Sequence, residues 1–598
     1  MIRSRCLAVL WTLFFILKTT NAAPTDVPSA ASFYVPFLPD IHQDPDHPLE
    51  IFAGHLSSDP AASKADAKAV TAHLYFVMIK NRRVADKKRI MFWFNGGPGC
   101  SSFDGLMMEV GPWRMDGNGG FKTAEGGWEE YMTMVYVDQP AGTGFSYTST
   151  DRYVHTLDEA STQFIEFMGN FYKTYLGGES YAGQYIPYFS DAILNSDLGV
   201  PLRGAAIGNG WIDARRQYAS YIDFAVKVGI LEEKSEAWKR ARARTDECLA
   251  DIAQITSPEP IAAPKCEGLL LEVTAVREKT VNGQKMCINI YDVRYDDIMP
   301  ACGMNWPPDI HPVTTYLDRP EVVRALHADR HPGSWVECRG RIHQEFHERL
   351  SNSSITVLPT VLARIPVLIF AGDQDLICNY VGLEAMMQAM EWNGAKGLGT
   401  VQTQSWSVAG APAGTWVTSR NLTYAKIFNA SHMAPFDLPH VSHDMILRFM
   451  GVDFSALVGG SAKIPSSIGT STKPQFLEDA PTETTTTFPT PGRVHSRPRR
   501  SYYNAGSAAL VLTVIFAAIG IFVWCRIRRR RNSPRLPMNQ TEENIPLNAR
   551  VDDEGGEVFR QRTRKGKGKE RAAEAEGPPM FDVGDSDDEE GYKDEYKS

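Results

Sequence analysis

The chain has 598 residues and a formal net charge of −9, with 43% hydrophobic and 22% charged residues. This is the composition of a globular protein, and it excludes a collagen-like, fully disordered or disulfide-dense small protein. The negative net charge gives no overall basic surface, so nucleic acid is not an expected partner. The length allows one large domain with appended segments, or two to four domains.

The N-terminus has the features of a secretory signal. Residues 1–22 begin with Arg3 and Arg5, continue with the apolar run Leu7–Leu17, and end in small residues near Ala22. This order predicts a signal peptide that is removed after about Ala22. An N-terminal anchor helix is the alternative, but such a run is short for a hydrocarbon layer of ~30 Å.

Two short apolar runs and a glycine-rich loop follow. Arg89–Phe94 and Met132–Val137 are bounded by turn residues, which is typical of strands buried on both faces. The loop Asn95–Ser102, NGGPGCSS, comes directly after the first of them. Its glycines allow backbone N–H groups to converge on one point, as an oxyanion hole requires. A plain turn is the alternative, and a phosphate loop is disfavoured because its lysine is missing.

Thr156–Tyr172 is predicted to be a helix, because Thr156 and Glu159 fit a capping box and apolar residues recur on one face. Only Lys173–Gly177 separates it from the next motif, which is short for both a turn and a strand. We therefore expect either that the last helical turn unwinds or that a segment is missing from the sequence.

The motif GESYAG at 178–183 places Ser180 between small residues, after an apolar run and before a helical pattern. This setting is typical of the strained strand-to-helix turn that exposes a nucleophilic serine. The strict pattern has glycine at position 182, where this chain has alanine. A surface turn is the alternative interpretation of the motif alone.

Further buried strands are predicted at Gly204–Ile207 and Ile365–Phe370. Strands that alternate with helices predict a mostly parallel sheet covered on both faces. The stretch from about 215 to 312 breaks this alternation with charged helical sequence and four cysteines. We expect it to be a disulfide-tied insertion above the sheet.

Two later residues complete a possible catalytic set. Asp375 follows the strand Ile365–Phe370, where a carboxylate can orient an imidazole, and His432 lies in a loop before a predicted final helix, Val441–Met450. The chain order Ser, Asp, His is that of the α/β-hydrolases. A serine hydroxyl becomes a good nucleophile when a histidine accepts its proton and an acid holds the histidine tautomer.

Two other clusters carry no site prediction. His343 and His347 lie four residues apart on a predicted helix, but no third metal ligand is apparent. Asp296 and Asp297 have the charge to bind a basic side chain, yet a solvated loop is favoured.

The lumenal part contains seven cysteines, which an oxidising compartment favours as three disulfides and one free thiol. It also contains three glycosylation sequons, at Asn352, Asn421 and Asn429. A fourth, at Asn539, lies beyond the predicted membrane span and is expected to stay unmodified.

The C-terminal part predicts a stalk, a membrane span and a tail. Residues 455–504 are rich in Ser, Thr and Pro, which favours an extended stalk. Residues 505–525 contain no charge and are long enough to span ~30 Å. The arginines that begin at Arg526 indicate a cytoplasmic side. We therefore expect a single-pass type I protein whose 526–598 tail is disordered.

Five motifs together resemble the serine carboxypeptidase family. They are WFNGGPGCSS at 93–102, VDQPAGTGFSY at 137–147, GESYAGQYIP at 178–187, GDQDLICN at 372–379 and NASHMAPFD at 429–437. The segment CGMNWPPD at 302–309, the stalk and the span resemble its fungal branch, which trims pheromone and killer-toxin precursors in the Golgi. The likeness covers about residues 30–452 and implies an α/β-hydrolase fold with a cap-like insertion.

The resemblance implies a role for each matching residue. Ser180 is the expected nucleophile, Asp375 the acid and His432 the base, and the backbone N–H groups of Gly97 and Tyr181 would form the oxyanion hole. The substrate's terminal carboxylate would be held by Asn95, Glu179 and the N–H of Gly96. One of two facing carboxyl groups must then be protonated, which predicts an acidic optimum. The implied disulfides are Cys100–Cys338, Cys248–Cys266 and Cys287–Cys302, with Cys378 as the free thiol.

The expected function is release of C-terminal Lys and Arg from peptide and protein precursors that a kexin-type endoprotease has cut in the trans-Golgi network. By resemblance, a part in programmed cell death is also implied. No metal and no cofactor are expected. Two alternatives stay open, a membrane-anchored esterase or acyltransferase on the same triad, and an inactive α/β-hydrolase-like binding module suggested by the short segment before Gly178.

Overall fold

The computed structural model describes residues 29–43, 48–59, 72–83, 88–149, 152–169, 171, 174–453 and 464–472. The predicted signal peptide, membrane span and tail lie outside these residues, as does most of the predicted stalk. Within the described ranges, no helix combines the length and apolar character needed to cross a bilayer.

A 13-stranded sheet runs through the centre of the fold, in the order β1-β2-β3-β7-β4-β8-β9-β13-β18-β17-β16-β19-β20. Neighbouring strands from β7 to β18 are parallel, and the strands on both sides of this group are antiparallel. The strands are β1 (Tyr34–Val35), β2 (Ile51–Ser57), β3 (His73–Ile79), β4 (Ile90–Phe94), β7 (Thr133–Asp138), β8 (Thr174–Glu179), β9 (Leu202–Gly208), β13 (Val367–Gly372), β16 (Gln404–Val408), β17 (Ala411–Ser419), β18 (Leu422–Ile427), β19 (Ser466–Ile468) and β20 (Ser471–Thr472). This is the α/β-hydrolase fold that the motifs implied.

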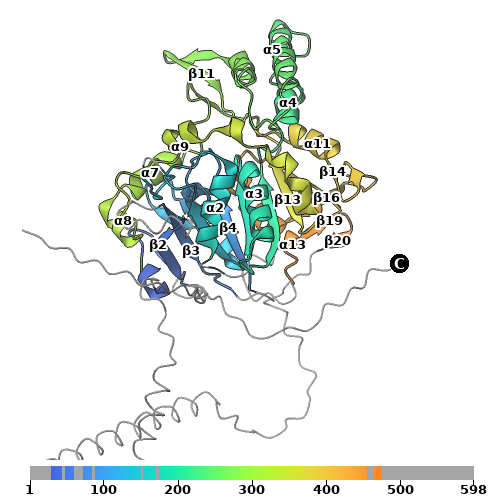
Figure 1. Ribbon diagram of the computed structural model, residues 1–598. Coiled ribbons are helices and arrows are strands. Elements are labelled where there is room, and N and C mark those ends of the chain that lie inside the picture. The colour runs from blue at the N-terminus through green and yellow to red at the C-terminus, as the bar shows by residue number, and fades with distance from the viewer. Residues whose placement is uncertain are drawn as a thin grey trace, which may run out of the picture. The chain divides into compact units, whose positions relative to one another are not determined.

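Helices cover both faces of the sheet, with α2 and α3 lying together over one of them (Figure 1). A hydrophobic core lies on each face of the sheet, and alternate residues of β4 contribute to one or the other. Phe92 packs into one core, and Met91 and Trp93 pack into the other. The principal helices outside the insertion are α2 (Leu157–Met168), α3 (Ala182–Asn195), α7 (Ile310–Leu317), α8 (Pro320–Ala325), α9 (Gly340–Glu345), α10 (Leu358–Leu362), α11 (Tyr380–Ala389), α12 (Ala434–Asp437) and α13 (Pro439–Phe449).

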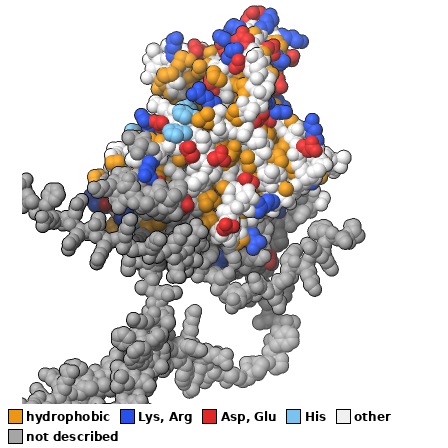
Figure 2. Space-filling model, viewed as in Figure 1, with side chains coloured by type: hydrophobic (Ala, Val, Ile, Leu, Met, Phe, Trp, Pro, Cys, Tyr) orange, Lys and Arg blue, Asp and Glu red, His pale blue; other side chains and the backbone are white. Residues whose placement is uncertain are grey.

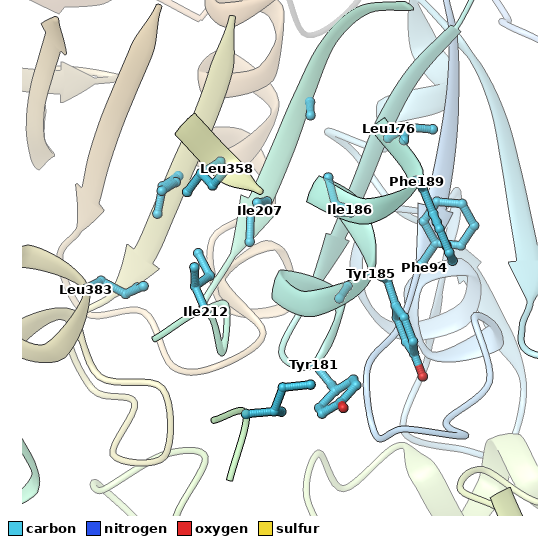
Figure 3. Packing of buried hydrophobic residues seen from close by; sticks show 14 of the residues in the cluster. Phe94, Leu176, Tyr181, Tyr185, Ile186, Phe189, Ile207, Ile212, Leu358 and Leu383 are labelled. Carbon is cyan, nitrogen blue, oxygen red and sulfur yellow. The ribbon is translucent and has the colours of Figure 1, made fainter. Parts of the chain in front are cut away.

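The core beneath α3 positions the nucleophile turn. Phe94 of β4 packs against Phe189 of α3, with ring centroids 5.3 Å apart, and Tyr185 stacks on Phe189. Figure 3 shows these rings beside Leu176 of β8 and Tyr181 at the start of α3. Burying each such side chain contributes about 1.5–3 kcal/mol, so the strand and helix that flank residue 180 are firmly held.

Helix α2 is shorter than expected. It begins after Thr156, whose hydroxyl accepts the Glu159 N–H at 3.2 Å, but it ends at Met168 instead of reaching Tyr172. Phe171 then leaves the helical path and packs its ring 5.1 Å from that of Phe92. The earlier end leaves room for the complete six-residue strand β8 before Ser180. The first of the two expectations for this segment, an unwound last turn, therefore describes the structure.

The predicted insertion projects from the sheet as a helical part and a small sheet (Figure 1). The helices are α4 (Ala214–Lys227), α5 (Glu236–Ile252) and α6 (Leu269–Thr274), and the strands are β10 (Lys279–Val281), β11 (Gln284–Ile288) and β12 (Asp296–Ile298). Cys248–Cys266 and Cys287–Cys302 tie the two parts internally. In Figure 2 charged side chains crowd α5, while hydrophobic ones lie over the small sheet.

Two differences from the sequence interpretation concern local structure. Residues 466–472, expected to lie in the stalk, form β19 and β20 and extend the sheet beyond β16. The polar Ser466 is anchored there because its hydroxyl contacts Asp444 and Arg448, both within 2.6 Å. In addition, α9 ends at Glu345, so His347 does not share a helix with His343.

Candidate active site

Ser180 lies at the sharp turn between β8 and α3. Its φ is +60°, a strained value for a residue that is not glycine. A Cβ on Gly178 would come within 2.2 Å of the Phe94 carbonyl oxygen, and one on Gly183 within 2.6 Å of the Trp211 oxygen. These close approaches explain why positions 178 and 183 are both glycine. Ala182, where the strict motif has glycine, is fully buried as the first residue of α3.

The acid and the imidazole meet at the same edge of the sheet. Asp375 follows β13, and its Oδ2 lies 2.8 Å from His432 Nδ1, with both side chains almost completely buried. The same Oδ2 accepts a hydrogen bond from Asn209 Nδ2 at 2.8 Å, and Oδ1 accepts one from the Ile377 N–H at 3.1 Å. The carboxylate is thereby fixed to hold one tautomer of the ring. The ring of Tyr291 packs against the imidazole, with its centroid 5.0 Å from that of His432.

Ser180, Asn209 and Asp375 stand on three adjacent strand ends, because β8, β9 and β13 are neighbours in the sheet. Among the contacts of the described residues, no hydrogen bond joins the Ser180 hydroxyl to His432. Such bonds in unliganded enzymes are often long and tighten in the substrate complex. The arrangement can therefore perform acyl transfer, provided that the serine hydroxyl comes within reach of the imidazole.

The glycine-rich loop lies directly against the nucleophile turn. A Cβ on Gly96 would meet the Tyr181 amide nitrogen at 2.5 Å and the Ser180 Cβ at 2.7 Å. Gly97 has φ of +107°, which glycine alone adopts without strain. The Gly97 and Tyr181 N–H groups donate to no backbone carbonyl in the described part of the chain. Two unused donors beside the serine hydroxyl are what an oxyanion hole needs.

A buried polar niche adjoins the nucleophile turn, because Glu179 directly precedes Ser180. Asn95 donates through Nδ2 to Glu179 at 3.0 Å and to Glu109 at 2.8 Å. Its Oδ1 accepts the Trp93 indole N–H at 2.9 Å and the Gly105 N–H at 3.0 Å. Because the carbonyl of the Asn95 side chain is occupied in this way, the amide must present its NH₂ group to the two carboxyl groups.

Both glutamates of the niche have raised pKa values. Burial raises the pKa of Glu179 well above its ordinary value, and the negative charge of Glu109 raises it further. Burial also raises the pKa of Glu109, although hydrogen bonds from Glu179 and Asn95 oppose the shift. The structure therefore favours a protonated Glu179 that donates to an ionised Glu109. A protonated Glu179 is also the form that can donate to a substrate carboxylate.

Glu109 and Asn209 were not identified from the sequence. Glu109 ends the short π-helix Gly105–Glu109, a type of turn that often occurs at functional sites. The sequence feature that could have identified Glu109 is its position as the one acidic residue in the apolar run GLMMEV. Asn209 stands between two glycines directly after a buried strand, with φ of +39°. That pattern marks a tight turn but does not reveal the contact with Asp375.

The structure also shows how the lumenal cysteines pair and how exposed the three sequon asparagines are. The disulfides are Cys100–Cys338, Cys248–Cys266 and Cys287–Cys302, the pairs that the resemblance implied, and Cys378 is a buried free thiol. The side chains of Asn352, Asn421 and Asn429 are exposed. Asn421 Nδ2 donates one hydrogen to the Leu362 carbonyl at 3.0 Å, which leaves the second hydrogen of the amide as the one that a glycan would replace.

One group of residues in the described ranges has the donor atoms for a metal. The ligand atoms of Asp375, Cys378 and His432 all lie within 4.8 Å of one another. However, Asp375 already accepts hydrogen bonds from His432 and Asn209. Burial raises the pKa of the Cys378 thiol, which disfavours the thiolate that metals bind. The donors therefore fit hydrogen bonding within the site better than a metal centre.

The fold and the order of the site residues define an α/β-hydrolase, and the serine carboxypeptidase family model matches residues 42–451. The chain belongs to this family and is a serine carboxypeptidase. It is 56% identical to the pheromone-processing carboxypeptidase KEX1 of Coprinopsis cinerea, over 98% of this chain and 97% of that protein. The protein of the same description from Cryptococcus gattii is 40% identical, over 95% and 93% of the two chains.

The crystal structure of Kex1Δp, described as a prohormone-processing carboxypeptidase from Saccharomyces cerevisiae, superposes with a TM-score of 0.66. The two sequences are 29% identical, and the match covers 71% of this chain and 97% of that one. The relatives together support a carboxypeptidase that acts in pheromone processing.

Proposed function

We propose that this carboxypeptidase removes C-terminal Lys and Arg from secretory precursors that a kexin-type endoprotease has already cut. It would act in the trans-Golgi network, anchored by the 505–525 span with its catalytic domain in the lumen. The high identity to KEX1 over nearly the full chain supports this assignment. The signal and span patterns at the two ends support the location.

In the proposed mechanism, His432 takes the proton of Ser180 as the hydroxyl attacks the last peptide bond. The resulting oxyanion is stabilised by the Gly97 and Tyr181 N–H groups, and Asp375 stabilises the imidazolium. The imidazolium then protonates the leaving amine, and the free C-terminal residue departs. Water, activated by His432, attacks the acyl-enzyme and releases the shortened peptide.

The observation that carries the proposal is the contact between Asn95 and Glu179, directly before Ser180. On substrate binding, the Asn95 amide and the protonated Glu179 would turn their donors from Glu109 to the substrate carboxylate, and the Gly96 N–H is assigned as a third donor. An endopeptidase or a simple esterase has no need of such a niche. A substrate carboxylate bound here would place the last peptide bond, and no other, over the serine.

The test is an assay of amino acid release from peptides that end in Lys, Arg, Phe or Leu. The Ser180→Ala protein serves as the blank, since it keeps the fold and removes the hydroxyl. The proposal predicts fastest release of Lys and Arg, and labelling of Ser180 by a fluorophosphonate. Faster release of Phe or Leu would refute the basic specificity, and an unlabelled folded protein would refute the role of Ser180.

A further inference from the structure

One arginine beside the niche has no role in the mechanism above. Arg114 lies on β5 (Trp113–Met115) and is half-buried. Its guanidinium group donates to the carbonyl of Glu109, to that of Gly111 at 3.2 Å and to that of Trp113 at 2.6 Å. No carboxylate of the described residues forms an ion pair with it. The guanidinium group is therefore held by neutral carbonyl groups, and its positive charge is not cancelled by a direct partner.

These contacts place the guanidinium group at the end of the π-helix Gly105–Glu109. The last carbonyl groups of a helix have no partner within the helix, and a basic side chain at that end is favourable. The turn that follows is tightly wound, because a Cβ on Gly111 would come within 1.9 Å of the Leu106 carbonyl oxygen. Arg114 thus holds a compact turn whose last helical residue is Glu109.

Glu109 is the negative group that this turn brings into the niche. Its side chain is 1% exposed, and its Oε1 accepts the Asn95 amide at 2.8 Å. If Glu179 carries the proton, Glu109 is ionised, and the substrate would bring a second carboxylate into the same buried space. Two negative charges in such a space are costly unless a positive charge lies close by.

The titratable groups around Glu109 and Arg114 come from several elements. The groups that act on Glu109 are Glu179 of β8, His432 and Arg114, and Glu109 in turn acts on Asp104. The groups that act on Arg114 are Glu109, Tyr136 of β7, Glu129 of the short helix Trp128–Glu130 and Asp309, which precedes α7. Of these, Glu129 already has an ion-pair partner, because its Oε1 lies 2.6 Å from Arg82.

Arg114 is the permanent cation among the groups that act on Glu109. His432 must be unprotonated to act as the general base, so it carries no charge when the substrate binds. A protonated Glu179, an ionised Glu109 and a positive Arg114 together have no net charge. A substrate carboxylate then meets hydrogen-bond donors without an excess of negative charge.

We infer that Arg114 is the counter-charge that lets the niche accept the terminal carboxylate of the substrate while Glu109 stays ionised. The inference rests on the proposed function, because it assumes that Asn95 and Glu179 bind this carboxylate. Arg114 acts through Glu109 and is therefore a positioning residue. Without its charge, Glu109 would have to take up a proton before the substrate carboxylate could bind.

The test measures KM, as a function of pH, for a peptide with a free C-terminal Lys and for its C-terminal amide. Arg114→Gln keeps a donor for the carbonyl groups but removes the charge, whereas Arg114→Lys keeps the charge. Lys122→Met is the matched control, because Lys122 is exposed and lies opposite Arg114 on β6 (Phe121–Thr123). The double variant Arg114→Gln/Glu109→Gln removes both charges. Thermal unfolding shows whether each protein is folded.

We expect Arg114→Gln to raise KM for the free peptide about tenfold at mildly acidic pH, and to leave KM for the amide and kcat nearly unchanged. In this variant KM should begin to rise at a lower pH than in the wild type, because Glu109 must also be protonated. Arg114→Lys and Lys122→Met should keep the wild-type profile. The double variant should recover a KM near that of the wild type at mildly acidic pH.

Equal increases of KM for the free and amidated peptides in Arg114→Gln would show that Arg114 only supports the fold. A double variant that does not recover would also contradict the inference, and in both cases the proposed function stands. If Arg114→Gln does not fold, a folded double variant with a near-normal KM supports the inference, and an unfolded one contradicts it. If the wild type itself does not distinguish the two peptides, the proposed function fails together with the inference.

Discussion

Asn95 and Glu179 are joined at 3.0 Å by a bond from the amide NH₂ group to the carboxyl group, and Glu179 directly precedes Ser180. The group proposed to hold the end of the substrate and the proposed nucleophile are thus consecutive residues of one buried strand end. Their separation cannot vary with loop motion. This fixed spacing explains in physical terms how an exopeptidase can measure one residue from a chain terminus.

The proton on Glu179 predicts a dependence of substrate binding on pH. Because the pKa of Glu179 is raised, the carboxyl group is protonated and able to donate at mildly acidic pH. As the pH rises through this pKa, the proton is lost and KM for peptides with a free C-terminus should increase. Glu179→Gln retains a donor that does not titrate, so its KM should vary less with pH. Identical pH profiles for the two proteins would contradict this explanation.

The aspartate of the triad can be tested against its neighbour in the same motif. Asp375→Asn should lower kcat by about four orders of magnitude with little change in KM, because the wrong tautomer of His432 is then held. Asp373→Asn is the matched control, since Asp373 accepts the Asn429 N–H at 2.8 Å and has no contact with the imidazole. Steady-state kinetics would contradict the assignment if both variants lost activity equally.

The nucleophile turn depends on Gly178 more than on position 182. Gly178→Ala places a Cβ 2.2 Å from the Phe94 carbonyl oxygen, so the strand and the turn must separate. We expect loss of activity and a lower unfolding temperature. Ala182→Gly restores the strict motif and should keep activity, with a stability loss of about 0.5–1 kcal/mol. A fully active Gly178→Ala protein would show that the turn tolerates the displacement.

Stability should be highest at mildly acidic pH. Burial raises the pKa of Asp138 to about 6 and that of Glu129 to about 7, the latter despite an ion pair with Arg82. In the unfolded chain these groups ionise near pH 4, so the folded state binds more protons between about pH 4 and pH 7. The free energy of unfolding therefore falls as the pH rises through this window. Each group lowers it by about 1.4 kcal/mol for every unit by which folding raises that group's pKa.

Thermal unfolding at about pH 5 and about pH 7.5 measures this effect. We expect the lower unfolding temperature at the higher pH. A higher unfolding temperature at about pH 7.5 would mean that other groups, with lowered pKa values, control the stability.

The central strands could be predicted from the sequence to within about two residues. Continuous apolar runs that end in Gly, Pro or Asn leave little freedom in where a buried parallel strand begins, as β4 and β13 show. The end of α2 was not predictable in this way. Phe171 continues the helical periodicity, yet its ring packs against β4 from outside the helix. The end of α2 is therefore set by the packing of Phe171 against the sheet and not by the local sequence pattern.

The predicted site residues were found through motifs whose spacing is local, whereas the missed ones act through contacts between distant segments. Glu109 reaches Asn95 only because a π-helical turn brings it back over the strand end. Asn209 reaches Asp375 because β9 and β13 are neighbours in the sheet. Strand order and turn type, which no short pattern encodes, determine both contacts.

The measurement that bears most directly on this account compares a peptide ending in a free C-terminal Lys with its C-terminal amide. If the niche of Asn95 and Glu179 binds the terminal carboxylate beside Ser180, the free peptide should be hydrolysed about a hundredfold faster or more, by charge-assisted hydrogen bonds that the amide lacks. The Ser180→Ala protein should hydrolyse neither peptide. Equal hydrolysis of the free and amidated peptides would contradict the assignment of the niche.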